Sequence, residues 1–140
     1  MTISESLYEY FRDCPLLARG TRLRFNYLST TPQEFAIEDT PEDPVIKRYT
    51  GGDSVRQKTF NLTSVEQYSE DQRVNIEKSG FFERLQDWIE EQNKKRNFPD
   101  LGEGREPRSL TCLTAGYLYT SEENIAHYQI QLRLIYYKAA

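Results

Sequence analysis

The sequence has little of what metal sites and reactive centres need. Among its 140 residues are one histidine, His127, and two cysteines, Cys14 and Cys112. A structural zinc site takes four His or Cys ligands, and a disulfide framework takes several cysteines, so we expect neither. His127 has no neighbouring nucleophile, although Glu122 and Glu123 lie across a predicted turn. We therefore expect no catalytic residue, no metal and no cofactor, and two reduced, buried thiols.

The sequence also lacks a long hydrophobic run and a strong excess of charge. No apolar stretch approaches the length that crosses a bilayer, and the N-terminus does not resemble a signal peptide, so we expect synthesis in the cytosol and no membrane contact. There are 18 basic and 22 acidic residues, for a net charge of -4. The densest basic cluster, Lys94-Lys95-Arg96, falls at a predicted helix end, where cations complement the helix dipole. This balance argues against sequence-specific nucleic-acid binding.

A long alternating segment near the C-terminus is the clearest structural signal. From Ala126 to Tyr137, apolar residues alternate with polar ones, and Ile135 is the only apolar residue among the polar positions. A period of two predicts a strand with one buried face and one wet face. The wet face is mostly polar and uncharged. This pattern favours a protein that presents a sheet to partners over an enzyme.

The remaining periodicities predict an α+β fold in a single domain, residues 1–140, with a mostly antiparallel sheet and two helices packed on one face. Apolar spacing predicts helices over Ile3–Asp13 and 71–93, the second carrying an apolar stripe. Alternation and turn residues predict strands over 23–28, 35–37, 45–49, 55–65 and 110–119, followed by the C-terminal strand. We expect 23–28 and 35–37 to form a hairpin. The weak apolar pattern of 55–65 suggests a sheet edge or a partner-facing strand, and Gly80 suggests close packing or a bend in the second helix.

The segment between residues 38 and 53 is the predicted interaction region. It begins with an acidic stretch that contains two prolines, which predicts an exposed loop, and ends in a Gly-Gly turn. A long irregular segment in a small domain is usually functional or disordered. We expect this segment to contact a neighbouring subunit or another protein of an assembly. The candidate interface residues are Glu38, Asp39, Glu42, Asp43, Arg48, Tyr49, Gly51, Gly52 and Asp53.

Several short motifs, taken in order, resemble those of one family. The match covers about residues 45 to 138, and its weight lies in the order and spacing of the motifs together. They are Tyr49-Thr50-Gly51-Gly52, Phe60, Asn75-Ile76-Glu77-Lys78-Ser79-Gly80-Phe81-Phe82, Asp87-Trp88-Ile89-Glu90-Glu91-Gln92, Phe98-Pro99, Ala115-Gly116-Tyr117 and Ala126-His127-Tyr128-Gln129-Ile130-Gln131-Leu132. The chain resembles the minor capsid or tail terminator proteins of tailed phages and prophages of Gram-positive bacteria.

The resemblance implies a structural virion protein without a cofactor. Such a protein forms a homo-oligomeric ring, usually a hexamer, on the end of the phage tail tube, where it stops tube growth and offers a surface to the head completion or connector protein. It would reside at the head-tail junction of the virion, and in the host cytoplasm before assembly. DNA would pass through the ring, and a mildly acidic chain suits that passage because it does not attract phosphates. Extended strands would provide edges for pairing between subunits.

Three other functions remain open from the sequence. The chain could be a different head-tail connector or tail completion protein. It could be a small enzyme, which would require His127 or a pair of carboxylates to lie in a concave pocket. It could also be a non-catalytic binding module, with a pocket lined by Tyr117, Tyr119 and Tyr128.

Overall fold

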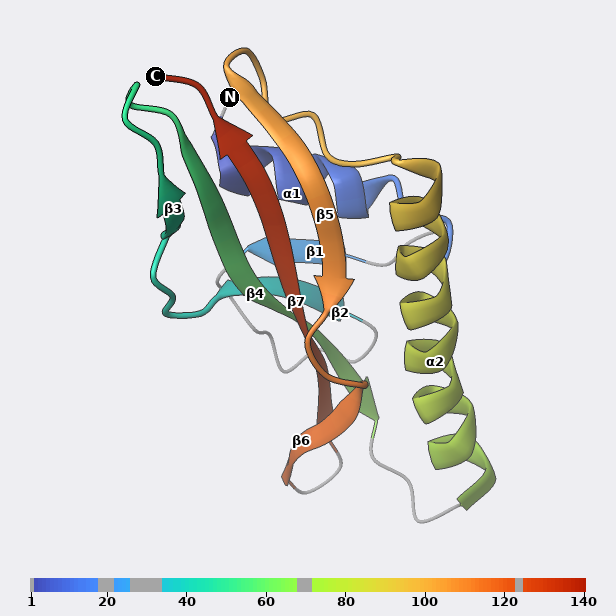
Figure 1. Ribbon diagram of the computed structural model, residues 1–140. Coiled ribbons are helices and arrows are strands. Elements are labelled where there is room, and N and C mark those ends of the chain that lie inside the picture. The colour runs from blue at the N-terminus through green and yellow to red at the C-terminus, as the bar shows by residue number, and fades with distance from the viewer. Residues whose placement is uncertain (1, 18–21, 26–33, 68–71, 123–124) are drawn as a thin grey trace.

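The computed structural model describes residues 2–17, 22–25, 34–67, 72–122 and 125–140 (Figure 1). The two helices and seven strands follow one another along the chain as α1 (Ile3–Arg12), β1 (Arg22–Phe25), β2 (Glu34–Asp39), β3 (Val45–Arg48), β4 (Ser54–Gln67), α2 (Gln72–Lys95), β5 (Arg105–Cys112), β6 (Tyr117–Glu122) and β7 (Ile125–Lys138). The predicted α+β class is confirmed.

One seven-stranded sheet forms the frame of the molecule. Its main path runs β1-β2-β4-β7-β5, and off this path β3 pairs with β4 and β6 pairs with β7. All pairs are antiparallel except β1 with β2, which is parallel. Both helices pack on the same face, and α2 runs beside the β5 edge (Figure 1). The mostly antiparallel sheet with two helices on one face is therefore confirmed.

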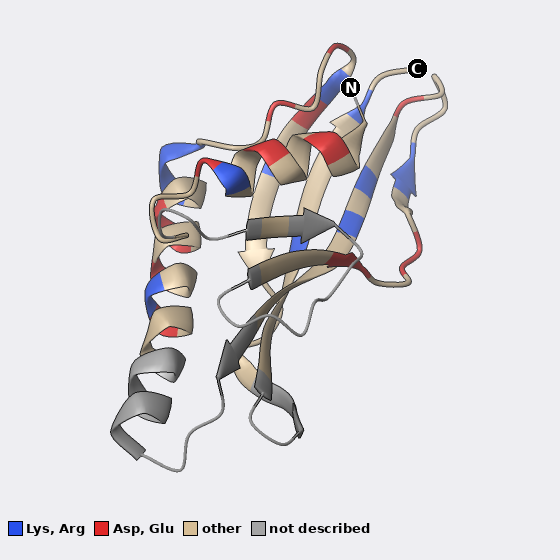
Figure 2. Cartoon of the chain, turned by 180° about the vertical axis from the view of Figure 1, so that it is seen from behind, with Lys and Arg blue, Asp and Glu red and all other residues tan. Residues whose placement is uncertain are grey.

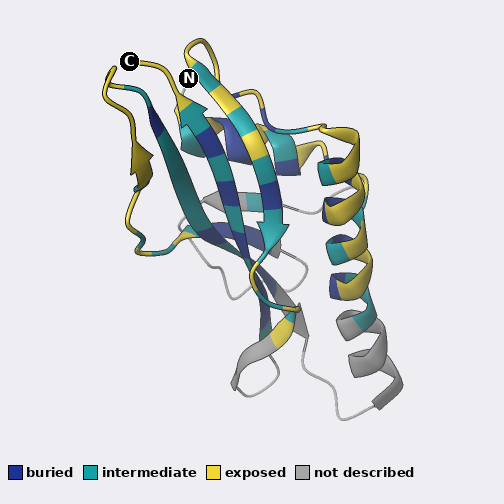
Figure 3. Ribbon diagram, viewed as in Figure 1, coloured by how far each residue is buried: buried dark blue, intermediate teal, exposed yellow. Residues whose placement is uncertain are grey.

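The core lies between the helices and the alternate residues of the central strands. Phe60 and Leu62 of β4 and Ile130, Leu132 and Leu134 of β7 are fully buried there. The predicted inward positions of β7 are confirmed for Tyr128 through Tyr136, and from Gln131 onwards these alternate with less buried residues (Figure 3). Burying each large apolar side chain contributes roughly 1.5–3 kcal/mol relative to exposure.

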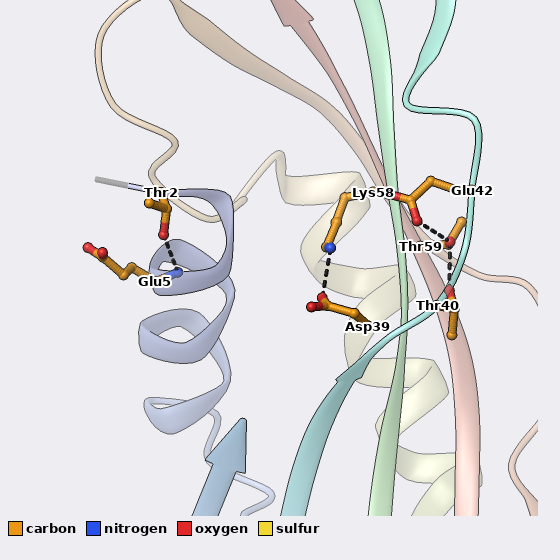
Figure 4. Close-up of polar contacts among 7 residues, drawn as sticks. All are labelled: Thr2, Glu5, Asp39, Thr40, Glu42, Lys58 and Thr59. Carbon is orange, nitrogen blue, oxygen red and sulfur yellow. Dashed lines mark hydrogen bonds and ion pairs between the residues drawn. The ribbon is translucent and has the colours of Figure 1, made fainter. Parts of the chain in front are cut away.

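Helix α1 begins and docks as its sequence predicts. The Thr2 hydroxyl accepts a hydrogen bond from the Glu5 backbone N–H at 3.1 Å, which caps the helix (Figure 4). Leu7 and Phe11, one turn apart, are fully buried, and the Phe11 ring lies edge-on to Phe60 at 5.9 Å between centroids. These two side chains attach α1 to the centre of the sheet.

Helix α2 docks through its predicted apolar stripe and ends in a defined cap. Phe82, Leu85 and Ile89 are buried, while Phe81 and Trp88 flank them and are partly buried. At the C-terminal end, Arg96 takes a left-handed conformation with φ of 57°. Its N–H bonds the carbonyl of Asn93, and the Asn97 N–H bonds the carbonyl of Gln92, which together form a Schellman motif. The Lys94-Lys95-Arg96 cluster therefore lies at a helix end, as predicted.

Three expectations about strands are wrong. β1 and β2 form no hairpin, because they run parallel and β2 also pairs with β4; alternation of side chains carries no information on strand direction. β4 is central and not an edge, since β2 and β3 flank one side and β7 the other. The predicted strand 110–119 is two strands, β5 and β6, interrupted at residues 113–116.

Gly116 and not Gly80 is the glycine that packing requires. A Cβ on Gly116 would lie 2.3 Å from the Cβ of Phe82, so this break between β5 and β6 meets α2 without room for a side chain. A Cβ on Gly80 would meet only the mobile end of Arg84, at 3.5 Å. The expected close packing at Gly80 is therefore wrong.

We expect alanine substitutions at these two glycines to change stability in opposite directions. Gly116→Ala should lower the free energy of unfolding by roughly 1–3 kcal/mol, because Phe82 must move. Gly80→Ala should raise it by about 0.5–1 kcal/mol, because alanine favours the helix. Urea denaturation monitored by circular dichroism measures both, with wild type as the reference. A Gly116→Ala protein as stable as wild type would contradict the close approach.

Candidate functional site

The sheet face opposite the helices is the most extensive polar surface formed by regular structure. It consists of alternate residues of the two central strands, which we call the open face. Its β4 members are Val55, Gln57, Thr59, Asn61 and Thr63, and its β7 members are His127, Gln129, Gln131, Arg133, Ile135 and Tyr137. No helix among the described residues covers this face (Figure 1). It is the wet face that the alternation of β7 predicted.

A hydrogen-bonded network of neutral groups occupies the middle of the open face. The Tyr117 hydroxyl accepts hydrogen bonds from the side-chain amides of Gln129 and Gln131, the latter at 3.4 Å. The Asn61 amide donates in turn to the Gln129 carbonyl oxygen at 3.5 Å. Gln129 is nearly buried beneath these neighbours. The network joins β4, β7 and β6 with uncharged groups only.

Three polar side-chain atoms on the open face are left without a hydrogen bond in the described part of the chain. They are Asn61 Oδ1, His127 Nε2 and Arg133 Nε, and each atom is shielded from solvent. A fourth such atom, Ser64 Oγ, lies on the helix side. An unsatisfied buried polar atom costs about 1–3 kcal/mol, so these three atoms lower the stability of the fold.

The first two acidic candidates lie in a strand and not in a loop, because β2 extends to Asp39. Their side chains leave β2 on opposite faces. Glu38 accepts a hydrogen bond from the Thr63 hydroxyl at 2.7 Å on the open-face side. Asp39 forms an ion pair with Lys58 at 2.7 Å on the helix side (Figure 4). The expected exposed loop from Glu38 onwards is therefore wrong in its first part.

The remaining acidic stretch is also held against β4. Thr59 donates to Glu42 at 3.3 Å and accepts from the Thr40 hydroxyl at 2.7 Å (Figure 4). The Asp43 carboxylate accepts the Val45 backbone N–H at 3.2 Å. Residues 40–44 thus form a short connection whose polar groups are engaged within the chain. The roles of Thr40 and Thr59 were not predicted from the sequence. A signal for Thr59 was present, because polar residues stand at every second position of β4, as they do in β7.

The turn between β3 and β4 brings the other candidates together. Arg48 ends β3, and both it and Tyr49 are exposed; the Tyr49 ring lies 5.1 Å from the Lys47 ammonium. The Gly52 N–H bonds the Tyr49 carbonyl at 3.0 Å, and Gly52 has a φ of 95° that favours glycine. The predicted turn at Gly51-Gly52-Asp53 is confirmed.

Asp53 fixes this turn to the end of β7. Its carboxylate accepts hydrogen bonds from the Tyr137 hydroxyl and from the Ala140 backbone N–H, the latter at 3.2 Å. The hydrogen bond to Asp53 raises the pKa of Tyr137 above its ordinary value. The guanidinium of Arg108 lies over the same ring at 5.4 Å. The nine candidates therefore do not form one site. Glu38 and Glu42 border the open face, Asp39 lies behind it, and Asp43 lies in the 40–44 connection. The other five cluster at the turn.

Two alternatives depend on where His127 and the tyrosines lie. His127 lies on the open face, and the acidic residues across its turn, Glu122 and Glu123, have no described side chains. Tyr117 and Tyr128 lie on opposite faces of the sheet, because Tyr128 is buried against Phe82 with 6.0 Å between ring centroids. The Tyr119 side chain lies outside the described residues. The proposed single pocket for these tyrosines is therefore wrong.

A groove between α2 and β5 is a cavity lined in part by the Cys112 thiol. Its volume is about 370 Å³. The lining residues are Gln86, Glu90, Asn93, Lys94, Leu110, Thr111 and Cys112. Burial, with a smaller contribution from Glu90, raises the pKa of Cys112 to about 11. A raised pKa keeps the thiol protonated at neutral pH, which is the opposite of what a nucleophile needs.

Two comparisons with known proteins found no match. No protein-family model matches it, and no curated protein matches its sequence. Among the described residues, three or more His, Cys, Asp or Glu nowhere gather as a metal site would require. Neither described helix combines the length and the apolar character needed to cross a membrane.

We expect Cys112 to react slowly with iodoacetamide at pH 8 and to accelerate with an apparent pKa near 11. A Cys14→Ala variant isolates the signal, and the same protein unfolded in urea provides the control, with a thiol pKa of about 8.5. Because folding raises this pKa, the thiol's contribution to stability is complete below pH 8.5 and is lost as the pH rises towards 11. An apparent pKa below 8.5 in the folded protein would contradict the burial of this thiol.

Proposed function

We propose that this protein is a structural subunit of a phage or prophage virion, a tail terminator that caps the tail tube as a ring and joins the tail to the head. The motif order that resembles this family supplies the specific role. The surface of the fold supports the general class, a protein that works by binding other proteins. In this role it needs no cofactor, and DNA passes through the ring it forms.

The open face is the observation that carries the proposal. Its centre is a set of neutral amide, hydroxyl and aromatic groups joined by hydrogen bonds. Protein interfaces are depleted of charge in their centre and enriched in tyrosine, and they contain about one hydrogen bond per 100–200 Å². The centre of the open face has this composition.

The turn beside the open face provides a second contact of the same kind. Ile46 and Tyr49 are 49% and 43% exposed, more than most large hydrophobic side chains of the chain. Asp53 and Tyr137 hold the turn to β7, so it is already ordered before a partner binds. We propose that residues 46–53 and the open face together contact the tail tube or the head connector.

We expect the purified protein to assemble into a closed ring of about six copies, alone or on the tail tube. Light scattering over a concentration series gives the mass, and negative-stain imaging of the same sample shows whether the assembly closes. A monomer that also fails to bind the end of purified tail tubes would contradict the terminator role. Binding only to a head protein would identify a different connector.

A bulky residue in the centre of the open face should prevent partner binding without unfolding the protein. Gln131→Trp places an indole beside Tyr117, and we expect loss of tube capping, by about a hundredfold in affinity or more, because a fully packed interface centre does not admit the added volume. Glu9→Trp, on the exposed side of α1, is the matched control and should cap normally. Capping by the Gln131→Trp protein at wild-type affinity would exclude the open face from the contact.

A further inference from the structure

Basic residues gather at one end of the sheet, on the face that carries the helices. Arg48 of β3 and Lys138 of β7 both pair in register beside Ser54 of β4, so the two side chains lie in one row across three strands. Arg56, two residues further along β4, points to the same face. Figure 2 shows the Lys and Arg segments of β3 and β4 side by side at this end. We call Arg48, Arg56 and Lys138 the basic corner.

The basic corner is open to solvent and collects like charge. Arg48 and Lys138 are exposed, and Arg56 donates only to the neutral Ser54 hydroxyl, at 3.0 Å, in the contacts that the structure gives it. The like charges of the basic corner repel one another, and an anionic partner would reduce this repulsion. Lys58, on the same face, pairs with Asp39 and is not part of the corner.

The outer side of α2 carries a matching set of acidic residues. Glu83, Asp87 and Glu90 are all exposed, and their spacing of four and three residues places them in one stripe along the helix. The exposed side of α2 faces away from the sheet (Figure 3). We call these three residues the acidic stripe. The helix lies at the β5 edge, while β3 lies at the opposite side of the sheet (Figure 1).

The two surfaces agree in spacing as well as in charge. Arg48 and Lys138 are separated by two strand spacings, or about 10 Å. Glu83 and Glu90 are separated by two helical turns, or roughly 10 Å along the axis. Each cation of the row could therefore meet one carboxylate of the stripe.

We infer that the basic corner of one copy binds the acidic stripe of α2 on the next copy, as the lateral contact of a ring. This inference rests on the proposed function for its ring geometry. Two different patches on opposite sides of one molecule make a head-to-tail contact, and such contacts close into rings when the rotation between copies permits. DNA phosphates are the other anion that could meet the corner, but only a second copy explains the stripe as well.

The test uses one variant for each side of the contact. Arg48→Glu with Lys138→Glu reverses the corner, and Glu83→Lys with Glu90→Lys reverses the stripe. Each variant alone should be monomeric by light scattering and sedimentation, since like charges across a contact weaken association by at least about tenfold. Mixed together, the two should form dimers and larger alternating oligomers, because the intact stripe of one meets the intact corner of the other and the two reversed patches also carry opposite charges. A protein with all four changes should assemble again.

Matched controls carry the same charge changes elsewhere. Arg12→Glu with Arg96→Glu, and Glu5→Lys with Glu9→Lys, alter exposed residues outside both patches and should assemble like wild type. If wild type forms rings and the corner and stripe variants do so too, the inference is overturned while the terminator role stands. If the mixed variants dimerise but wild type forms open chains that do not cap tubes, the contact stands and the terminator role fails.

The DNA alternative has its own readout. Binding of wild type to a short DNA duplex, measured by fluorescence anisotropy, should be no stronger than that of the corner variant if the corner serves a second copy. Loss of DNA binding in the corner variant, without dimer formation in the mixture, would overturn the inference in favour of phosphate contacts.

Discussion

The pairing of β4 with β7 is the constraint on which the rest of the structure depends. The two strands align over their whole length, from Ser54 opposite Lys138 to Gln67 opposite Ile125. Their helix-facing residues form the floor of the core, and the flanking strands β2, β3, β5 and β6 each bond to one of the two. Because the partners are far apart in sequence, closing this ladder is costly in entropy, and a fold with such contacts forms slowly.

The same register gives the sheet one face that packs against the helices and one that is the open face. A shift by one residue would move Leu132 to the open face and Arg133 into the core, so burial of one face fixes the position of every side chain on the other. The neutral network around Tyr117 and Gln129 is therefore placed by the core behind it. The core therefore holds the side chains of the open face in place, although no described helix covers them.

Sequence patterns predicted the elements whose packing is one-sided. β7, α1 and α2 were visible because a single apolar face leaves a period of two or of about four. β4 was misjudged as an edge because Asn61 and Thr63 face the open side and its basic end weakens the apolar pattern. Local patterns do not encode contacts between distant segments. Such contacts determine the parallel pairing of β1 with β2, the close approach of Gly116 to Phe82 and the hydrogen bond from Thr59 to Glu42. Among the candidate residues, the turn at Gly51-Gly52-Asp53 was predicted correctly. The exposed loop predicted from Glu38 onwards was wrong for Glu38 and Asp39, which lie in β2.

The irregularities of the outer strands bear on how copies could associate. β5 contains Pro107, which lacks an N–H donor, and its register with β7 shifts between Pro107 and Ser109. β3 is four residues long, and its register with β4 shifts between Val45 and Lys47. Prolines, bulges and short strands hinder the addition of a further strand to a sheet edge. Backbone pairing between subunits, which the extended strands first suggested, is therefore disfavoured at β3 and β5, where contact through charged and polar side chains is the alternative.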